Sequence, residues 1–357
     1  MDFISIVCII LLFFIIHNFV VSRYFHIELT PDEIHFTFTR DNWRLAISRY
    51  KPEKQLYKEP VILCHGLGVN RYNMDFGNDF SIAKFLRDRG FDVWVAELRG
   101  IGYSGHPRIF SRYRYGYSFD DFVNLDAPAI IDAVTAETGV SKVFWVGHSM
   151  GGMIAYCFLQ SSLASKIAGV VAVASPHRFK TRKSIGLDNS FLRLCYPLRV
   201  LHLEQITTTI APYIQAIPNV LLKNILNPAN ITPYMLKRAS VNVNANISCG
   251  VFRQFADWSR TGHMMDSYMN IDYTDGMKNI TTPIFFLSGG GDMIVPPRLV
   301  KELHDTISSK DKTFKCFSIA EGFKSDYGHG DILLGTTAPL EVYPAISEWI
   351  EARADKK

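Results

Sequence analysis

The chain of 357 residues is 48% hydrophobic and 20% charged, a composition that excludes an intrinsically disordered protein. Its 38 basic and 34 acidic side chains leave a formal net charge of +4, scattered along the sequence, which argues against a nucleic-acid-binding surface. The six cysteines are widely spaced and form no C-x-x-C pair, so neither a zinc site nor a dense disulfide framework is expected. Cys195 and Cys249 remain the one candidate disulfide pair.

The first predicted element is an apolar helix with the sequence FISIVCIILLFFIIHNFVV, residues 3–21. Such a helix would span about 28 Å, enough to cross the hydrocarbon core of a bilayer. The segment lacks the basic n-region and the A-x-A site of a signal peptide. We therefore expect residues 1–22 to form a retained, single-pass membrane anchor, with a cleaved signal sequence as the alternative.

The charges around this segment predict its orientation. Only Asp2 precedes it, whereas Arg23 and Arg40 follow it, so the positive-inside rule places the main body in the cytoplasm. A secreted or lumenal body is the alternative, and three Asn-x-Ser/Thr sequons permit it: Asn230, Asn246 and Asn279. A glycan on any of these three would contradict the cytoplasmic placement.

A β-hairpin is predicted next, because residues 33–39 and 43–50 alternate apolar and polar side chains around the turn-forming pair Asp41-Asn42. Six short apolar runs follow: residues 60–64, 91–96, 142–146, 167–174, 283–287 and 313–319. Helix-like stretches separate these runs, among them residues 78–89 and 119–138. Strands buried on both faces lack polar alternation. This order predicts an α/β fold with a mostly parallel, doubly wound sheet.

About a hundred residues, 177–282, interrupt the alternation with helical pieces punctuated by proline. We expect a core in two parts, residues 31–176 and 283–353, with 177–282 inserted as a helical cap or lid. An insertion at this point would lie over the carboxyl ends of the strands, where open α/β sheets bind ligands. The alternative is a packed helical subdomain without ligand contact.

A G-x-S-x-G pattern joins a predicted strand to a predicted helix, in the sequence Gly147-His148-Ser149-Met150-Gly151. Glycines at both ends allow the sharp turn that exposes a nucleophilic serine hydroxyl. His148 sits next to this serine, but such a neighbour generally points away, so we expect His148 to have a packing role. Ser149 is the predicted nucleophile.

A serine nucleophile needs a histidine base and a carboxylate that orients the base. Asp292 lies in a glycine-rich loop after a predicted strand, and His329 lies in a Tyr-Gly-His-Gly-Asp sequence after the next one. The order serine, aspartate, histidine is the one expected for this architecture. Asp326 and Asp331 are nearer to His329 in the sequence, and they remain as alternatives to Asp292.

The tetrahedral intermediate of such a reaction needs backbone N–H donors. The Met150 amide follows the nucleophile, and the Leu67 amide, in the loop after the first buried strand, is the second candidate. Gly66 would let this loop approach the substrate closely. His65 is a candidate for shaping the same loop.

Residues 31–349 resemble the α/β-hydrolase superfamily, and within it the acid-lipase branch of neutral-lipid esterases. The resemblance rests on GHSMG, on LCHGL at residues 63–67, on FLRDRGFDVWVAELRGIGYS at residues 85–104 and on residues 119–138. It implies an eight-stranded core, a triad of Ser149, Asp292 and His329, carboxylic ester substrates, a mobile cap, and no metal or organic cofactor.

The chain departs from the acid lipases at three places. They commonly have glutamine where this chain has Met150, an asparagine-rich arginine loop where it has residues 97–100, and a different motif around His329. The lipid class therefore stays open. We expect a serine esterase that cleaves lipid or acylglycerol esters through an acyl-enzyme, and the alternatives are an acyltransferase or thioesterase with the same triad and a noncatalytic lipid-binding protein.

Overall fold

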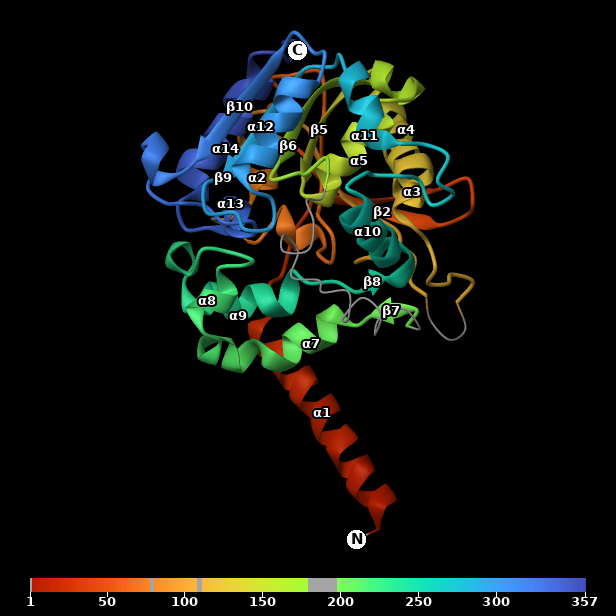
Figure 1. The fold of residues 1–357 in the computed structure, drawn as a ribbon, viewed down its shortest axis with the longest axis vertical. Helices are drawn as coiled ribbons and strands as arrows, with labels where there is room; N and C mark the ends of the chain where they lie inside the picture. Colours follow the sequence, from red (N-terminus) through yellow and green to blue (C-terminus); the bar gives the residue numbers. More distant parts are fainter. Residues whose placement is uncertain (1, 78–79, 108–110, 179–197) are drawn as a thin grey trace.

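The computed structural model describes residues 2–77, 80–107, 111–178 and 198–357. A twisted sheet forms the centre of the body, helices cover both of its faces, and the long helix α1 (Phe3–Phe25) projects from one end (Figure 1). Helix α1 is the one described helix long and apolar enough to cross a membrane, with a mean hydropathy of 2.8 over its best window.

The sheet has eight strands in the order β1-β2-β4-β3-β5-β6-β9-β10. The hairpin strands β1 and β2 are antiparallel, β2 pairs antiparallel with β4, and all the other pairs are parallel. The predicted α/β fold with a mostly parallel sheet is thus confirmed. The strands are β1 (Glu33–Phe38), β2 (Arg44–Tyr50), β3 (Val61–Cys64), β4 (Val93–Glu97), β5 (Val143–His148), β6 (Ile167–Val173), β9 (Ile284–Gly289) and β10 (Lys312–Phe317).

Two hydrophobic cores lie on opposite faces of the sheet because successive side chains of a strand point to opposite sides. In β3, for example, Ile62 and Cys64 belong to one core, and Val61 and Leu63 belong to the other. The first core includes buried side chains of α4 (Ala127–Thr138), α5 (Met150–Phe158) and α12 (Pro297–Thr306), and the second includes those of α2 (Ile82–Asp88) and α14 (Ala338–Glu351). The apolar strands therefore need no polar alternation.

The predicted helix over 119–138 is interrupted in the structure. It consists of α3 (Phe119–Asp121), a π-helical turn η2 (Phe122–Asp126) and α4. Pro128 lies in the first turn of α4 and has no amide hydrogen to continue a regular helix. The break leaves the Asp126 carboxylate buried against the Arg99 guanidinium at 2.8 Å, and burial raises the pKa of Asp126 to about 6 although Arg99 opposes the shift.

The segment between β6 and β9 has two different surroundings. Its second half packs into the body, since Val251, Phe255 and Trp258 of α10 (Cys249–Thr261) belong to the first core. Its first half lies at the end of the body from which α1 projects (Figure 1). This half comprises β7 (Val200–Leu201), α7 (Leu203–Ile210), η4 (Ala211–Ala216), α8 (Asn219–Leu222), η5 (Pro228–Asn230) and α9 (Pro233–Asn242).

The remaining elements connect these parts. A short strand β8 (Ile247–Ser248) pairs with β7, and α11 (Tyr273–Gly276) and η6 (Met277–Asn279) lead back to the sheet. The other short helices are η1 (Arg71–Asn73), η3 (Ser162–Lys166), η7 (Ile319–Glu321) and α13 (Asp331–Leu334). The division at residues 177 and 282 stays a prediction, and the proposed partner of Cys249, Cys195, lies outside the described residues.

Candidate active site

Ser149 occupies the turn between β5 and α5 in a strained backbone conformation, with φ 51° and ψ −115°. Residues other than glycine seldom adopt a positive φ, and such backbone strain is often found at functional sites. The Ser149 amide donates to the Val173 carbonyl at 2.8 Å, which fixes the turn to the neighbouring strand. The serine hydroxyl therefore stands at the carboxyl edge of the sheet, at the start of a helix.

The two motif glycines are required by the closeness of the backbone around this turn. A Cβ atom on Gly147 would lie 2.3 Å from the carbonyl carbon of Gly151. A Cβ atom on Gly151 would lie 2.3 Å from the carbonyl oxygen of Cys64, on the adjacent strand. Neither contact is with a flexible side chain, so any larger residue would move the backbone that carries Ser149.

The structure brings Ser149, His329 and Asp292 into one hydrogen-bonded chain. The Ser149 Oγ lies 2.9 Å from the His329 Nε2, and the His329 Nδ1 lies 2.8 Å from the Asp292 Oδ2. Because a carboxylate only accepts hydrogen bonds, the imidazole proton sits on Nδ1 and leaves Nε2 to accept from the serine hydroxyl. This is the arrangement that a general base needs.

The Asp292 carboxylate is held from both sides. Its Oδ1 accepts from the amides of Ile294 at 2.9 Å and Val295 at 2.8 Å, while Oδ2 faces His329. The Asp292 side chain is fully buried, and the His329 side chain is 11% exposed, so the histidine is the less buried of the two. Gly289 lets the two loops meet, because a Cβ atom there would lie 2.2 Å from the Tyr327 carbonyl oxygen.

The two rival carboxylates have other partners. Asp331 accepts from the amides of Asn227 at 2.7 Å and Gly328 at 3.0 Å, and from the Asn230 side chain at 2.9 Å. Burial raises the pKa of Asp331. Its contacts tie the loop of His329 to the segment between α8 and α9, and the Gly330 amide adds a bond to the Ile225 carbonyl at 2.9 Å.

Asp326 also has a structural partner, since its Oδ1 accepts from the Ile319 amide at 2.9 Å. Asp326 thus closes the turn that follows β10. Of the three carboxylates considered, Asp292 is the one within hydrogen-bond distance of the His329 ring among the described residues. The geometry therefore favours Asp292 as the orienting group.

The loop after β3 lies against the nucleophile. A Cβ atom on Gly66 would lie 3.2 Å from the Ser149 Cβ, which shows how closely the two segments approach. His65 braces this loop, because its Nδ1 donates to the Gly66 carbonyl at 2.9 Å and its Nε2 accepts from the Leu98 amide at 3.4 Å. Burial lowers the pKa of His65 to about 4, so the ring is neutral.

Leu67 and Met150 are the residues whose amides are predicted to bind the oxyanion. Leu67 follows Gly66 in this braced loop and packs against the cluster of Ile247 and Phe252, and Met150 begins α5 directly after the nucleophile. The helix α5 directs its free amides and positive dipole end toward the same region. The assignment of the Leu67 and Met150 amides as donors stays a prediction.

His148 makes a polar contact that its position in the sequence did not indicate. Its ring nitrogens lie 3.0 Å from the His329 carbonyl oxygen and 3.0 Å from the Asn73 side-chain oxygen position. Burial, with a smaller contribution from His329, lowers the pKa of His148 to about 3, so the ring is neutral and has one N–H. Because the His329 carbonyl oxygen can only accept, we assign the proton to Nε2, which then donates to that carbonyl.

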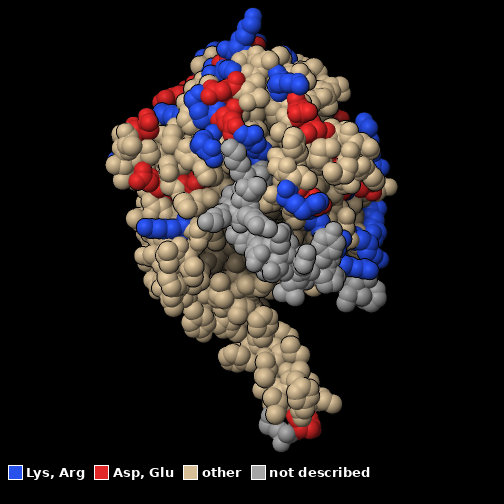
Figure 2. All heavy atoms as spheres, in the orientation of Figure 1, with Lys and Arg blue, Asp and Glu red and all other residues tan. Residues whose placement is uncertain are grey.

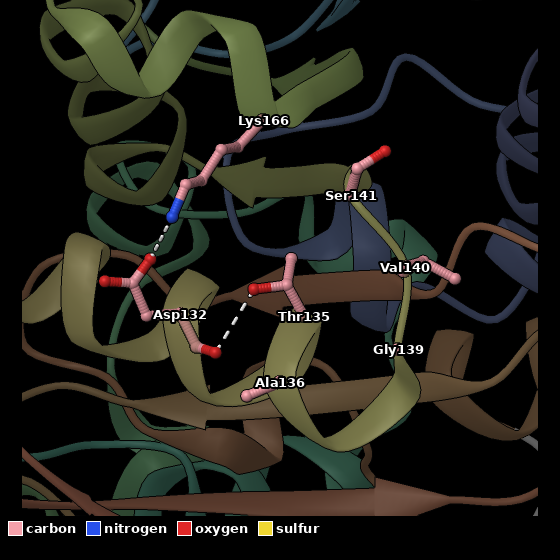
Figure 3. Close-up of a pocket in the computed structure, with 7 residues that line it drawn as sticks. All are labelled: Asp132, Thr135, Ala136, Gly139, Val140, Ser141 and Lys166. Carbon is pink, nitrogen blue, oxygen red and sulfur yellow. Dashed lines mark hydrogen bonds and ion pairs between the residues drawn. The ribbon is translucent and has the colours of Figure 1, made fainter.

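A surface hollow of about 480 Å³ lies elsewhere, between the end of α4 and Lys166 (Figure 3). Its lining includes Asp132, whose carboxylate pairs with the Lys166 ammonium group at 2.5 Å, and Thr135, whose hydroxyl donates to the Asp132 carbonyl (Figure 3). The hollow lies next to the amino ends of β5 and β6, whereas Ser149 follows the carboxyl end of β5. It is therefore separate from the candidate active site.

Comparison with known proteins agrees with this fold and with an ester hydrolase. Human lipase member M is 25% identical over 358 aligned positions, covering 88% of this chain and 82% of the lipase. Human gastric triacylglycerol lipase is also 25% identical, covering 92% of this chain and 89% of the lipase. The relatives are thus consistent with the resemblance to the acid-lipase branch.

Solved structures share the architecture. The monoacylglycerol lipase of Paleococcus ferrophilus superposes with a TM-score of 0.60 at 22% identity, covering 87% of this chain and 99% of that chain. A thermophilic esterase from Thermogutta terrifontis gives a TM-score of 0.58 at 17% identity, and the superposition covers 90% of this chain and 100% of the esterase. The Hydrolase_4 family profile, described as serine aminopeptidase S33, matches residues 57–320, and the chain therefore belongs to this family of α/β hydrolases.

Proposed function

We propose that the protein is a membrane-anchored serine hydrolase that cleaves the carboxylic esters of lipids. The observation that carries the proposal is the hydrogen-bonded chain from Ser149 through His329 to Asp292, at 2.9 and 2.8 Å. The lipases among its relatives support ester cleavage and a lipid substrate. The apolar helix α1 supports the membrane anchor.

In the proposed mechanism, His329 takes the proton of Ser149 as its Oγ attacks the ester carbonyl carbon. The amides of Leu67 and Met150 bind the oxyanion that forms, and the His329 imidazolium then protonates the departing alcohol. A water molecule, deprotonated by the same histidine, attacks the acyl-serine and releases the carboxylic acid. Asp292 keeps the Nδ1 proton in place and stabilises the imidazolium.

The first experiment compares the full chain with Ser149→Ala. We expect a fluorophosphonate probe to label the parent and not the variant, and hydrolysis of a soluble short-chain p-nitrophenyl ester to fall by at least about 10³-fold. An aminoacyl p-nitroanilide is assayed in parallel because the family description names an aminopeptidase. Absence of labelling in a folded parent, or equal ester turnover in both proteins, would contradict the mechanism.

The substrate class is tested separately. A series of p-nitrophenyl esters with acyl chains of increasing length measures the pocket that holds the acyl group, and we expect medium to long chains to give the highest kcat/KM. Adding a competing alcohol distinguishes hydrolysis from acyl transfer. A product that is mainly the new ester, with little free acid, would favour the acyltransferase.

The proposed cytoplasmic placement of the body can be tested through its sequons. Asn230 is buried, its side chain donates to Asp331 and accepts from the hydroxyls of Thr336 and Thr337, so a glycan there is incompatible with this fold. Asn279 is exposed at the end of η6 and would accept a glycan in a lumenal body. We expect the electrophoretic mobility of the cellular protein to be unchanged by endoglycosidase. A glycosidase-sensitive band that is absent from Asn279→Gln would show that the body is lumenal.

A further inference from the structure

Helices α7 and α9 pack against α1, and together with the neighbouring elements at this end of the body they carry exposed apolar side chains. These side chains belong to α7, η4, α8, α9 and the turn after α8, and each is at least half exposed; they are Ile206, Tyr213, Val220, Leu221, Ile225 and Tyr234. We name these six residues the apolar face. In the view of Figure 2, the described surface that continues from α1 onto the lower left of the body is mainly uncharged, whereas basic and acidic side chains lie together on the end opposite α1 and basic ones also line the right edge.

Polar contacts fix α1 to this part of the chain. His17 and Asn18 interrupt the apolar run of α1, and both bind Thr209 of α7: the His17 Nε2 lies 3.1 Å from its carbonyl oxygen and the Asn18 Nδ2 3.0 Å from its hydroxyl. The His17 ring also stacks on Tyr213, with ring centroids 6.1 Å apart. The two polar side chains that interrupt the apolar run of α1 thus have partners in the body, although Asn18 also donates to the Phe14 carbonyl within α1.

The end of α1 is anchored as well. The Asn242 side chain donates to the Phe25 carbonyl at 2.9 Å and accepts from the Ile27 amide at 3.0 Å. Val21 and Phe25 are buried together with Ala211 and Val241. These contacts set the direction in which α1 leaves the body, so a bilayer crossed by α1 has a defined position relative to α7 and α9.

The length of α1 brings that bilayer to the apolar face. The part of α1 before its contact with α7, residues Phe3 to Ile16, is about 21 Å long at 1.5 Å per residue. The hydrocarbon core of a bilayer is about 30 Å thick. The remaining thickness, about 9 Å, has to be filled by the part of α1 that packs on the body, and this brings Tyr213 and its neighbours into contact with lipid.

The charges of this region suit a phospholipid surface. Residues 203–242 contain one acidic side chain, Glu204, against three basic ones, Lys223, Lys237 and Arg238. Tyrosine and lysine side chains are favoured at the headgroup level because they combine an apolar body with a polar end. Tyr213, Tyr234 and Lys223 are exposed in this way.

Helix α7 also connects this region with the loop beside the nucleophile. At its other end, the Leu203 Cδ2 lies 3.0 Å from the position of a Cβ atom on Gly68, and Leu203 packs with Leu67 and Ile247. The helix has eight residues and is therefore about 12 Å long. The loop that carries Leu67 is thus one short helix away from the contact with α1.

We propose that the apolar face docks onto the phospholipid bilayer that α1 crosses, so that ester substrates reach Ser149 directly from the lipid. The inference rests on the membrane-anchored hydrolase proposed above. It assigns α7, η4, α8 and α9 the role of a membrane contact surface, in addition to the anchoring by α1. Soluble esters do not need this surface, whereas esters embedded in a bilayer do.

The activity test uses the full chain reconstituted in phosphatidylcholine vesicles. Val220→Glu with Leu221→Glu adds two charges to residues that are 70% and 56% exposed. The matched control, Tyr268→Glu with Ile271→Glu, adds them to residues that are 81% and 50% exposed in the loop before α11, near Gln160 at the far end of α5 from Ser149. Neither pair belongs to the proposed catalytic machinery.

We expect the Val220/Leu221 variant to hydrolyse a vesicle-embedded long-chain ester at least about fivefold more slowly than the parent, because its glutamates oppose burial in lipid. Its turnover of a soluble short-chain ester should be unchanged, and the control should match the parent on both substrates. Equal vesicle turnover in the two variants would overturn the docking proposal. If the parent itself does not hydrolyse the soluble ester, the proposed hydrolase function is contradicted instead.

A second readout needs no activity. Tryptophan is introduced as Val220→Trp or Ile271→Trp. The fluorescence of each variant is measured in vesicles of ordinary and of brominated phosphatidylcholine, and the fluorescence of the parent protein in the same vesicles is subtracted. Bromine quenches indoles that contact the acyl chains, so we expect quenching at position 220 and none at position 271. Equal quenching at the two positions would overturn the proposal.

Discussion

Replacing Asp292 with asparagine isolates what the carboxylate does for His329. In Asp292→Asn the side-chain oxygen still accepts from the amides of Ile294 and Val295, so the loop keeps its two backbone hydrogen bonds. The NH₂ group then replaces the oxygen that faces the His329 Nδ1 at 2.8 Å. Because NH₂ is a donor, Nδ1 has to become the acceptor, and the ring proton moves to Nε2, where it faces Ser149.

A histidine in this tautomer cannot accept the serine proton. We expect kcat for a soluble ester to fall by about 10⁴-fold, which corresponds to about 5.5 kcal/mol of transition-state stabilisation. Stability should change by less than about 1 kcal/mol, because the two bonds to backbone amides are kept. The matched control is Asp326→Asn, whose oxygen keeps its bond to the Ile319 amide and whose activity should stay within about twofold of the parent.

Steady-state kinetics and urea denaturation of both variants provide the measurement. A loss of less than tenfold in Asp292→Asn, with the protein folded, would refute the assignment of the orienting carboxylate. A larger loss in Asp326→Asn than in Asp292→Asn would exchange their roles.

Three further predictions concern the surroundings of the triad. Gly151→Ala places a Cβ atom 2.3 Å from the Cys64 carbonyl oxygen and should lower the free energy of unfolding by at least about 2 kcal/mol in urea denaturation, whereas Gly330→Ala, with its nearest atom at 3.6 Å, should cost less than about 1 kcal/mol. His148→Phe removes the donor to the His329 carbonyl and should lower kcat about tenfold at nearly constant KM; His148→Gln should recover part of the loss, and a change in KM alone would contradict a positioning role. Burial lowers the pKa of His65 from 6.5 to about 4, so between these pH values the ring is protonated in the unfolded chain and neutral in the folded one. Lowering the pH from 6.5 to 5.0 should therefore reduce the free energy of unfolding of His65→Asn by about 1 to 2 kcal/mol less than that of the parent. Equal reductions in the two proteins would contradict the neutral buried ring.

The sequence was most informative where local chemistry determines structure. The alternating runs before and after Asp41-Asn42 form the hairpin of β1 and β2, with Asn42 at a φ of 66° in its turn. The buried strands were identifiable because short apolar runs without polar alternation recur between helix-like stretches. The G-x-S-x-G pattern between a strand and a helix led directly to the turn that holds Ser149.

Contacts between distant segments were predictable for the triad, whose three residues stand in recognisable motifs, but not where no motif marks the residues. His148 was expected to pack, but its partners, Asn73 and the His329 carbonyl, come from parts of the chain that no local pattern connects. The helix over 119–138 was predicted as continuous because its apolar spacing continues through η2, whereas Pro128 interrupts the backbone hydrogen bonding at the start of α4. The bonds of His17 and Asn18 to Thr209 likewise depend on where the chain places α7.

The bonds from Asp331 and Gly330 to residues 225–230 have a consequence for protein engineering. The segment that carries the proposed base and the segment between α8 and α9 each donate hydrogen bonds to the other. A chimera in which only residues 177–282 were replaced by the corresponding segment of another hydrolase would be expected to lose these bonds and to displace the His329 imidazole. Transplants between related hydrolases should therefore exchange residues 225–231 and 325–337 as one cassette.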